Sequence, residues 1–334
     1  MKVHVQLDSP PGAGAARSLE LAETGAAGLF TFEGQHDVFF PLVEAASSVD
    51  LDLMTNVAIA FPRSPMHLAN SANDLQLLSR GRFRLGLGSQ IKPHIEKRYS
   101  ATWSRPAARM KETVSAIKAI LAAWENTTPL NFRGEFFTHT LMPPTFDPGP
   151  NPYGPPPILM GALGPIMTRT AAEVADGLLV MPFHTERHFL ERTLPAVDAG
   201  LRESGRPRNE FAIIPQIIVG VGRTSEQLDA AARGVRSLLS FYGSTPAYRP
   251  VLDIEGWGDV QAELNALSKR GGYAEMTSLI TDPMLETLAV VGTPEECAAE
   301  IRRRFGEHAN EVCCYFPGYS QDPADVAAMI AALA

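Results

Sequence analysis

The chain has 334 residues, and 45% of them are hydrophobic, which is enough apolar material for a large buried core. Its formal net charge is -8 and its basic residues are dispersed, so neither nucleic acid nor an anionic membrane surface is an expected partner. The N-terminal residues alternate like a strand and no run of about eighteen apolar residues occurs, so we expect a cytoplasmic protein.

The three cysteines are Cys297, Cys313 and Cys314, an odd number crowded near the C-terminus. Their spacing fits neither a disulfide framework nor a zinc site. We therefore expect buried free thiols.

The first part of the chain alternates short apolar runs with segments of helical periodicity. Strands are expected at 3–7, 29–32, 53–60 and 83–87, and helices at 18–26, 40–48, 68–78 and 106–124. Ser104 is a candidate cap for the last of these helices. Each predicted strand is thus followed by a predicted helix.

Residues 126–157 interrupt this alternation, because a hairpin-like segment is followed there by a run dense in proline. Alternation resumes with strands at 158–160, 177–181, 213–219 and 312–316. Thr293 and Glu296 have the spacing of a capping box at the start of a late helix. Residues 243–282 are the least periodic segment and a candidate lid.

Eight strands that alternate with helices predict a single (β/α)8 TIM barrel over residues 1–334, with excursions at about 126–157 and 243–282. In such a barrel the loops after the strands form the active-site face. Several polar residues and one glycine turn should therefore meet at one mouth: Asp8, Glu33, His36, Asn56, Ser89, Gln90, Gly161 and His184.

The turn Gly161, Ala162, Leu163 and Gly164 joins a predicted strand to a helix that begins at Pro165. Its free N–H groups and the positive end of the helix dipole would suit a phosphate. Many such turns use glycine only for tight geometry, so the turn alone leaves both interpretations open.

Metal, nucleophilic and dinucleotide chemistry are not favoured by the motifs. His184 and His188 are spaced four apart, as on one helix face, but no further ligand lies near them, and we expect no metal site. No GxSxG elbow occurs, and Gly86-Leu87-Gly88 lacks the third glycine of a Rossmann fingerprint. A wide mouth with one anion site instead suits a large, flat cofactor.

Several motifs, in order along nearly the whole chain, resemble the bacterial luciferase-like superfamily. They are Leu29–Glu33, Ser79–Arg82 running into Leu85–Ser89, Gly161–Gly164 before Ala175–Gly177, and Val291–Glu296. The segments Gly34–Asp37, Phe39–Leu42 and His94–Arg98 are most similar to the branch that depends on the deazaflavin coenzyme F420.

The resemblance implies a barrel, usually dimeric, that binds a flavin or deazaflavin at its mouth. It implies that Gly161, Ala162, Leu163 and Gly164 hold the cofactor phosphate. It also implies that Asn56, Val57 and Ala58 form a bulge behind the ring, with a non-prolyl cis peptide near Val57 and Ala58. Further cofactor-binding candidates are Ser89, Gln90, His94, Met181 and His184.

Two positions depart from the sugar-phosphate dehydrogenases of that branch. There an acidic residue directly precedes a histidine, whereas Gly34 follows Glu33 here and the histidine is His36. Ile91 stands where those enzymes have a glutamate acid. A sugar-phosphate substrate is therefore not predicted.

The resulting prediction is an F420-dependent oxidoreductase that acts on a small molecule, with Glu33 or His36 as the polar group nearest hydride transfer. The first alternative is an FMN-dependent monooxygenase of the same fold, which uses reduced flavin and oxygen. The second is a non-catalytic flavin or F420 carrier. A homodimer is expected from the resemblance.

Overall fold

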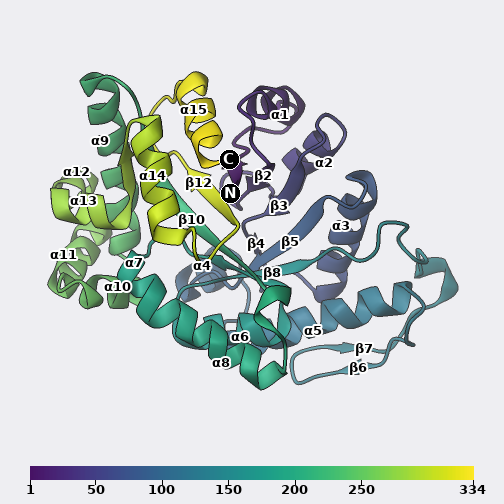
Figure 1. Cartoon of the computed structure of the whole chain (residues 1–334). Helices are drawn as coiled ribbons and strands as arrows, with labels where there is room; N and C mark the ends of the chain where they lie inside the picture. Colours follow the sequence, from purple (N-terminus) through teal and green to yellow (C-terminus); the bar gives the residue numbers. More distant parts are fainter.

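The computed structural model describes residues 1–334 and contains a closed parallel barrel surrounded by helices (Figure 1). The barrel strands follow one another in the order β12-β1-β2-β3-β5-β8-β9-β10, and β10 pairs with both β9 and β12 to close the ring. The predicted (β/α)8 fold is confirmed.

The strands of the main sheet have these bounds: β1 Lys2–Gln6, β2 Gly28–Thr31, β3 Asp52–Thr55, β4 Ala58–Ile59, β5 Phe83–Gly88, β8 Ile158–Ala162, β9 Gly177–Val180, β10 Ala212–Val221, β11 Val290–Gly292 and β12 Glu311–Tyr315. A separate hairpin is formed by β6 Phe132–Arg133 and β7 Thr138–His139.

The α-helices have these bounds: α1 Gly14–Ala22, α2 Phe40–Ala46, α3 Pro65–Leu78, α4 Lys92–Lys97, α5 Pro106–Trp124, α6 Pro165–Val174, α7 Glu186–His188, α8 Leu194–Ser204, α9 Ser225–Gly243, α10 Arg249–Ile254, α11 Gly258–Lys269, α12 Tyr273–Ser278, α13 Asp282–Leu288, α14 Pro294–Phe305 and α15 Pro323–Leu333. Shorter helical turns are η1 Pro144–Phe146, η2 Phe189–Thr193, η3 Arg208–Glu210 and η4 Pro246–Tyr248.

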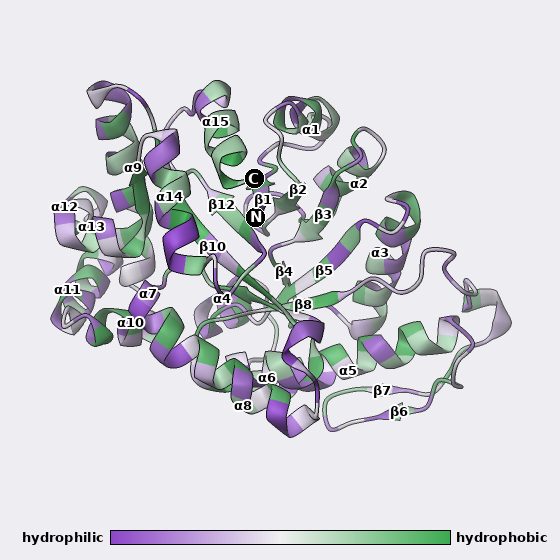
Figure 2. Ribbon diagram, in the orientation of Figure 1, coloured by the Kyte–Doolittle hydropathy of each residue, from purple (hydrophilic) through white to green (hydrophobic).

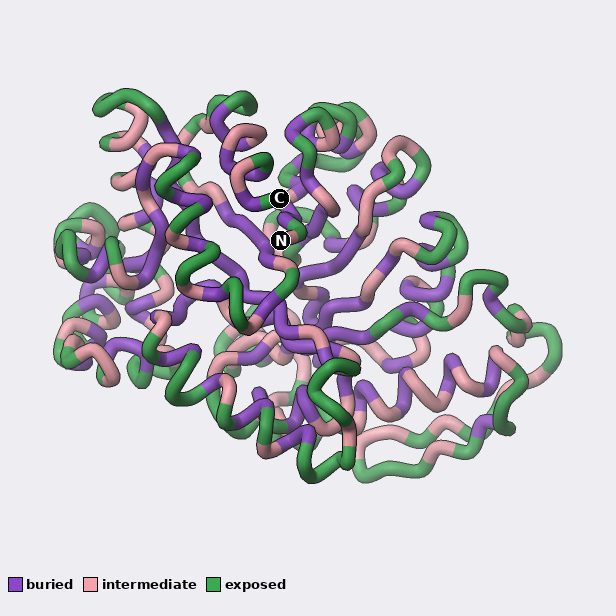
Figure 3. The backbone as a smooth tube through the Cα atoms, viewed as in Figure 1, coloured by how far each residue is buried: buried purple, intermediate pink, exposed green.

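The hydrophobic core has three parts. Inward-facing side chains such as Phe30, Met54, Leu179 and Tyr315 fill the barrel. A larger cluster lies between the strands and the surrounding helices, which turn their apolar faces inward (Figures 2 and 3). No helix is long and apolar enough to cross a membrane.

The predicted lid segment, residues 243–282, is mostly helical. Helices α10, α11 and α12 pack with α9 and α13 around a third hydrophobic cluster, which includes Phe183, Leu239 and Met276. The proline-rich excursion contains the short hairpin β6–β7 and the turn η1, and Figure 3 shows it largely exposed at the edge of the molecule.

The capping expectations had mixed outcomes. The capping box is confirmed, because Thr293 N donates to Glu296 Oε2 at 2.9 Å and Glu296 N donates to Thr293 Oγ1 at 3.3 Å. The Ser104 cap was wrong: α5 begins after Arg105, whose backbone is left-handed at φ 36° and whose side chain caps nothing. The three cysteines are buried and free, as expected.

The amino ends of the strands are joined by a partly buried ionic network, in which the side chains of Arg84 and Glu311 are each 16% exposed. Arg84 on β5 donates two hydrogen bonds of 2.9 Å to Glu311 on β12, and Glu311 Oε2 lies 2.7 Å from His4 Nε2 on β1. Burial lowers the pKa of His4 despite this carboxylate, so its neutral imidazole donates from Nε2. The termini meet on this side too, since the Met1 amino group donates to Leu333 O at 2.9 Å (Figure 1).

Candidate active site

The bulge at Val57 lies against two neighbouring strand ends. A Cβ atom added to Gly161 would lie 3.0 Å from Val57 Cγ1, and one added to Gly88 would lie 2.5 Å from Val57 Cγ2. The segment between β3 and β4 therefore meets the ends of β5 and β8 closely, and glycine at both positions makes the approach possible. The cis peptide implied by the resemblance is present, between Asn56 and Val57, one residue before the expected position.

Asn56 is buried with an unpaired side chain. It is 4% exposed, and neither its Oδ1 nor its Nδ2 atom has a nitrogen or oxygen partner, although the Cys313 thiol lies beside it. Its backbone is held on both sides, because its N–H donates to Thr31 O at 2.6 Å and its carbonyl accepts from the Tyr315 hydroxyl at 3.2 Å. A buried amide without partners is costly, so this side chain is a natural recognition group for a polar ligand.

The turn from Gly161 to Gly164 has open space at its helix end. Gly164 is the N-cap of α6, no side chain caps the helix, and a Cβ atom added to Gly164 would meet no atom within 4 Å. The N–H groups of the first helical turn have no partner within the helix. An anion can therefore approach these donors without steric obstruction.

Glu33 is fixed by three donors. Its Oε2 accepts from Ile59 N at 2.8 Å and from Arg63 Nη1 at 2.6 Å, and its Oε1 accepts from the Tyr99 hydroxyl at 3.1 Å. Its side chain is only 8% exposed. Burial and, after it, the negative charge of Glu33 raise the pKa of Tyr99. The hydroxyl is therefore protonated and donates a hydrogen bond to Glu33.

Arg63 and Arg98 extend this arrangement to the loop after β2. Arg63 Nη2 lies 3.2 Å from Asp37 Oδ2, and Arg98 Nη2 donates to Gly34 O at 2.8 Å. We call Glu33, Asp37, Arg63, Arg98 and Tyr99 the mouth clamp. It joins the loops after β2 and β4 to the segment around α4. His36 lies in the clamped loop with an exposed side chain that makes no hydrogen bond.

Ser89, Gln90 and His94 lie at and after the end of β5, next to Gly88. Gln90 has a left-handed backbone at φ 57°, and its Oε1 accepts from Ile91 N at 3.0 Å. Ser89 Oγ donates to Gln90 O at 3.1 Å. All three side chains are partly exposed, so they remain accessible to a ligand at this strand end.

His184 is buried among aromatic rings and makes no hydrogen bond to the other candidate site residues except Met181. Its Nδ1 lies 2.8 Å from Met181 O, and its ring is 5.6 Å from that of Phe305 and 6.2 Å from that of Phe189. Burial lowers the pKa of His184 to about 4. It precedes α7, which begins at Glu186, so the expectation that His184 and His188 share a helix was wrong. No group of three or more potential metal ligands is found.

The roles of Arg63, Tyr99 and Tyr315 were not predicted from the sequence. Arg63 lies between two prolines in the sequence, Pro62 and Pro65, and nothing there marks it as the ionic partner of Glu33. Tyr315 follows two cysteines in a strand, and its hydroxyl also donates to Gln216 Oε1 at 2.8 Å. Alternation along that strand places Tyr315 on the same face as Cys313, which was the available signal for an inward ring.

Comparison with known proteins gives the family. A family model described as luciferase-like monooxygenase matches residues 13–309. An uncharacterized protein of Mycobacterium tuberculosis (strain H37Rv) is 45% identical over 306 residues, which cover 91% of this chain and 90% of the relative. A 5,10-methylenetetrahydromethanopterin reductase of Archaeoglobus fulgidus is 29% identical over 240 residues, which cover 71% of this chain and 68% of the relative.

A solved structure shares the fold. The coenzyme F420 dependent tetrahydromethanopterin reductase from Methanopyrus kandleri superposes with a TM-score of 0.80 at 18% identity, covering 99% of this chain and 96% of that one. The relatives and structural neighbours with named activities are oxidoreductases and monooxygenases, which supports an enzyme with a deazaflavin or flavin cofactor. Because the match covers most of its length, the chain belongs to the luciferase-like monooxygenase family.

Proposed function

We propose that this protein is an oxidoreductase that moves a hydride between C5 of coenzyme F420 and a small organic substrate. Similarity to a putative coenzyme F420-dependent oxidoreductase of Mycobacterium tuberculosis (strain H37Rv), 26% identical over 316 residues, supports the choice of F420 over FMN. The resemblance of Gly34–Asp37 and His94–Arg98 to the F420 branch supports it independently. The substrate and the direction of transfer are left open.

One observation carries the proposal: the bulge of Asn56, Val57 and Ala58 contains a buried amide without a nitrogen or oxygen partner, and it packs against Gly161, three residues before the open N-terminus of α6. Asn56 would offer its amide to the polar edge of the ring, while Val57 and Ala58 would support the ring face. Gly164 and the N–H groups of α6 would receive the phosphate. The remaining proposed cofactor-binding residues are Ser89, Gln90, His94, Gly161, Ala162, Leu163 and Met181. We leave out His184, because aromatic rings enclose it.

Bound F420 would supply the hydride chemistry, and the protein would hold the cofactor and the substrate in position. Glu33 accepts three hydrogen bonds within the mouth clamp, so we assign it a positioning role. His36 is an exposed histidine of the clamped loop whose side chain makes no hydrogen bond, and it is the remaining candidate for moving a proton. Hydride transfer needs mainly the close approach of two carbons, which the fixed loops would favour.

Titration of the purified protein with F420 and with FMN tests the cofactor. F420 fluorescence should be quenched on binding, with a lower Kd than FMN gives in a matched titration. Tighter binding of FMN would overturn the choice of F420. Tight F420 binding without hydride exchange for any donor or acceptor would overturn the enzymatic role and leave a carrier.

The second candidate is an FMN-dependent monooxygenase. The description of the matching family as luciferase-like monooxygenase favours it. In that case reduced FMN should support oxygen uptake that depends on the protein, and F420 should give no turnover. Measurement of oxygen consumption separates the two candidates.

The homodimer remains a prediction. Several apolar side chains on α2 and α3 are exposed in one chain, among them Phe40 at 61%, Val43 at 44% and Leu77 at 50%. A subunit interface over these helices would cover them. Light scattering of the purified protein gives the mass directly, and a value near 36.1 kDa would contradict the dimer.

A further inference from the structure

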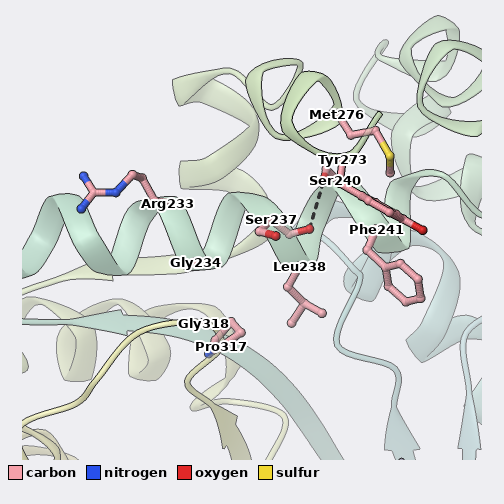
Figure 4. Close-up of a pocket in the computed structure, with 10 residues that line it drawn as sticks. All are labelled: Arg233, Gly234, Ser237, Leu238, Ser240, Phe241, Tyr273, Met276, Pro317 and Gly318. Carbon is pink, nitrogen blue, oxygen red and sulfur yellow. Dashed lines mark hydrogen bonds between the residues drawn. The ribbon is translucent and has the colours of Figure 1, made fainter. Parts of the chain in front are cut away.

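A pocket of about 560 Å³ lies between α9, α12 and the loop that follows β12 (Figure 4). This volume is in the range of small-molecule sites. None of its lining residues belongs to the proposed cofactor-binding group or to the mouth clamp. The pocket therefore needs an explanation of its own.

One end of the pocket carries unpaired polar groups. Arg233 and Ser237 lie four residues apart, on the same face of α9, and both are exposed. Neither side chain makes a hydrogen bond or an ion pair within the chain. By contrast, Arg236 on the same helix is held by Asp282 and by Ile280 O. Arg233 is thus left available for an anion.

The other end of the pocket is aromatic. Phe241 on α9 is 53% exposed and Tyr273 on α12 is 63% exposed, so both rings are open to solvent at this end of the pocket. Leu238 and the buried Met276 add further apolar surface. These rings would lose contact with water if a flat apolar group bound between them.

The pocket has a close-packed wall. Gly234 on α9 lies directly against the backbone of Pro317 and Gly318, so close that a Cβ atom at position 234 would overlap the Pro317 carbonyl. Gly318 has a left-handed backbone at φ 72°. Helix and loop therefore meet through backbone atoms, which fixes this side of the pocket without long side chains.

We propose that this pocket binds an aromatic small molecule that carries one negative charge. Its anionic group would bind Arg233 and Ser237, and its ring system would lie against Phe241 and Tyr273. Arg233 and Phe241 are eight residues apart, which is about 12 Å along a helix and suits a ligand of two or three fused or linked rings. The inference goes beyond the proposed function, because it requires neither F420 nor hydride transfer.

Two fluorescent probes that differ in charge test the proposal. The probe 8-anilino-1-naphthalenesulfonate carries a sulfonate, and N-phenyl-1-naphthylamine has the same rings without it. Both fluoresce when bound to an apolar surface. We expect the sulfonate probe to bind to the full chain with one saturable site and at least about threefold more tightly than the neutral probe. Equal affinities would overturn the anionic end of the site.

Variants locate the probe. Arg233→Gln should weaken the sulfonate probe about threefold and leave the neutral probe unchanged. Phe241→Ala should weaken both probes about tenfold. The matched controls are Arg202→Gln, at an exposed arginine of α8 whose side chain has no partner, and Phe146→Ala, at a ring that is 72% exposed on the proline-rich excursion. Both controls should bind like wild type.

Two results would overturn the proposal. One is an equal loss of affinity in Arg233→Gln and Arg202→Gln, because the sulfonate would then respond to general surface charge. The other is displacement of the probe by saturating F420 in direct competition, because the probe would then occupy the cofactor site. Circular dichroism of each variant checks that the fold is retained, and all four positions are exposed.

Discussion

Each end of the barrel has a carboxylate paired with an arginine, but the two ion pairs connect different parts of the fold. At the amino end Glu311 binds Arg84 and His4, so its partners are strand residues on β5 and β1. At the mouth Glu33 binds Arg63, Tyr99 and the N–H of Ile59, and most of these lie in loops. The first network joins strands and the second positions loops.

The difference shows how one kind of interaction can serve stability or function. An ion pair between strands contributes to every folded molecule, whereas one between loops mainly restricts how the mouth can move. It also gives Glu33 a positioning role as an alternative to that of a proton donor. The following predictions test this division, from the largest expected effect to the smallest.

Arg84→Met should lower the free energy of unfolding by about 2–3 kcal/mol, because it leaves the largely buried Glu311 without its cation. Urea unfolding followed by circular dichroism measures this. The double variant Arg84→Met/Glu311→Leu should recover much of the loss, since no unpaired charge remains. A loss of cofactor affinity without a loss of stability would contradict the structural role of the amino end.

Gly164→Asp should weaken F420 binding by about 2 kcal/mol, or roughly thirtyfold, because its carboxylate would repel the phosphate. Position 164 is an N-cap with open space, where Asp and Asn both favour the helix. Gly164→Asn is therefore the matched control and should bind F420 nearly like wild type. Equal affinities for the two variants would mean that no anion binds at this turn.

Glu33→Gln should lower the free energy of unfolding by about 1.5 kcal/mol, because Arg63 loses the more buried of its two charged partners, Glu33 and Asp37. If Glu33 only positions the loops, Tyr99→Phe should reduce turnover to a similar extent, since it removes another contact of the same clamp. Steady-state kinetics of both variants separates the roles. A loss of about a hundredfold or more in Glu33→Gln alone would identify Glu33 as an acid or base.

Lowering the pH should remove part of the stability that the ionic network at the amino end of the barrel contributes. Burial opposes ionisation of Glu311, but hydrogen bonds from His4 and Arg84 outweigh it and lower its pKa to about 2, from an ordinary value of 4.5. A depressed pKa gives stability that is fully present above the unfolded value and is lost as the pH falls toward the folded one.

Between pH 7 and pH 4 this loss should be about 1 kcal/mol. Urea unfolding of wild type and Glu311→Gln at both pH values measures it, because the variant lacks this titration. Equal pH dependence in the two proteins would contradict a depressed pKa of Glu311.

The barrel was predictable because its signal is local. Each strand and its helix are marked by their own periodicity, from residues 3–7 to the capped helix at Thr293. The break in the third strand was not visible in residues 53–60, which are apolar apart from Thr55 and Asn56; only the resemblance implied the bulge there. Residues 243–282 were expected to be the least periodic segment, and helices α10 and α12 within it have six residues each, too few to show a helical period.

The site was only partly predictable, because only part of it is formed by residues that are close in the sequence. Gly161–Gly164 is a local turn, so its geometry can be read from neighbouring residues. The mouth clamp depends on pairs 30 and 66 positions apart, Glu33 with Arg63 and with Tyr99. No periodicity links such residues, and without them Glu33 resembles a free catalytic acid.

The length of β10 has a mechanical consequence. Residues Ala212–Ile218 pair with β9 and β12 within the barrel, and Val219–Val221 continue outward to pair with β11. One unbroken strand therefore carries both the barrel wall and the attachment of the helices between α9 and α13. A hinge at this junction would have to break ladder hydrogen bonds, so force applied to those helices is transmitted to the barrel rather than absorbed by a flexible linker.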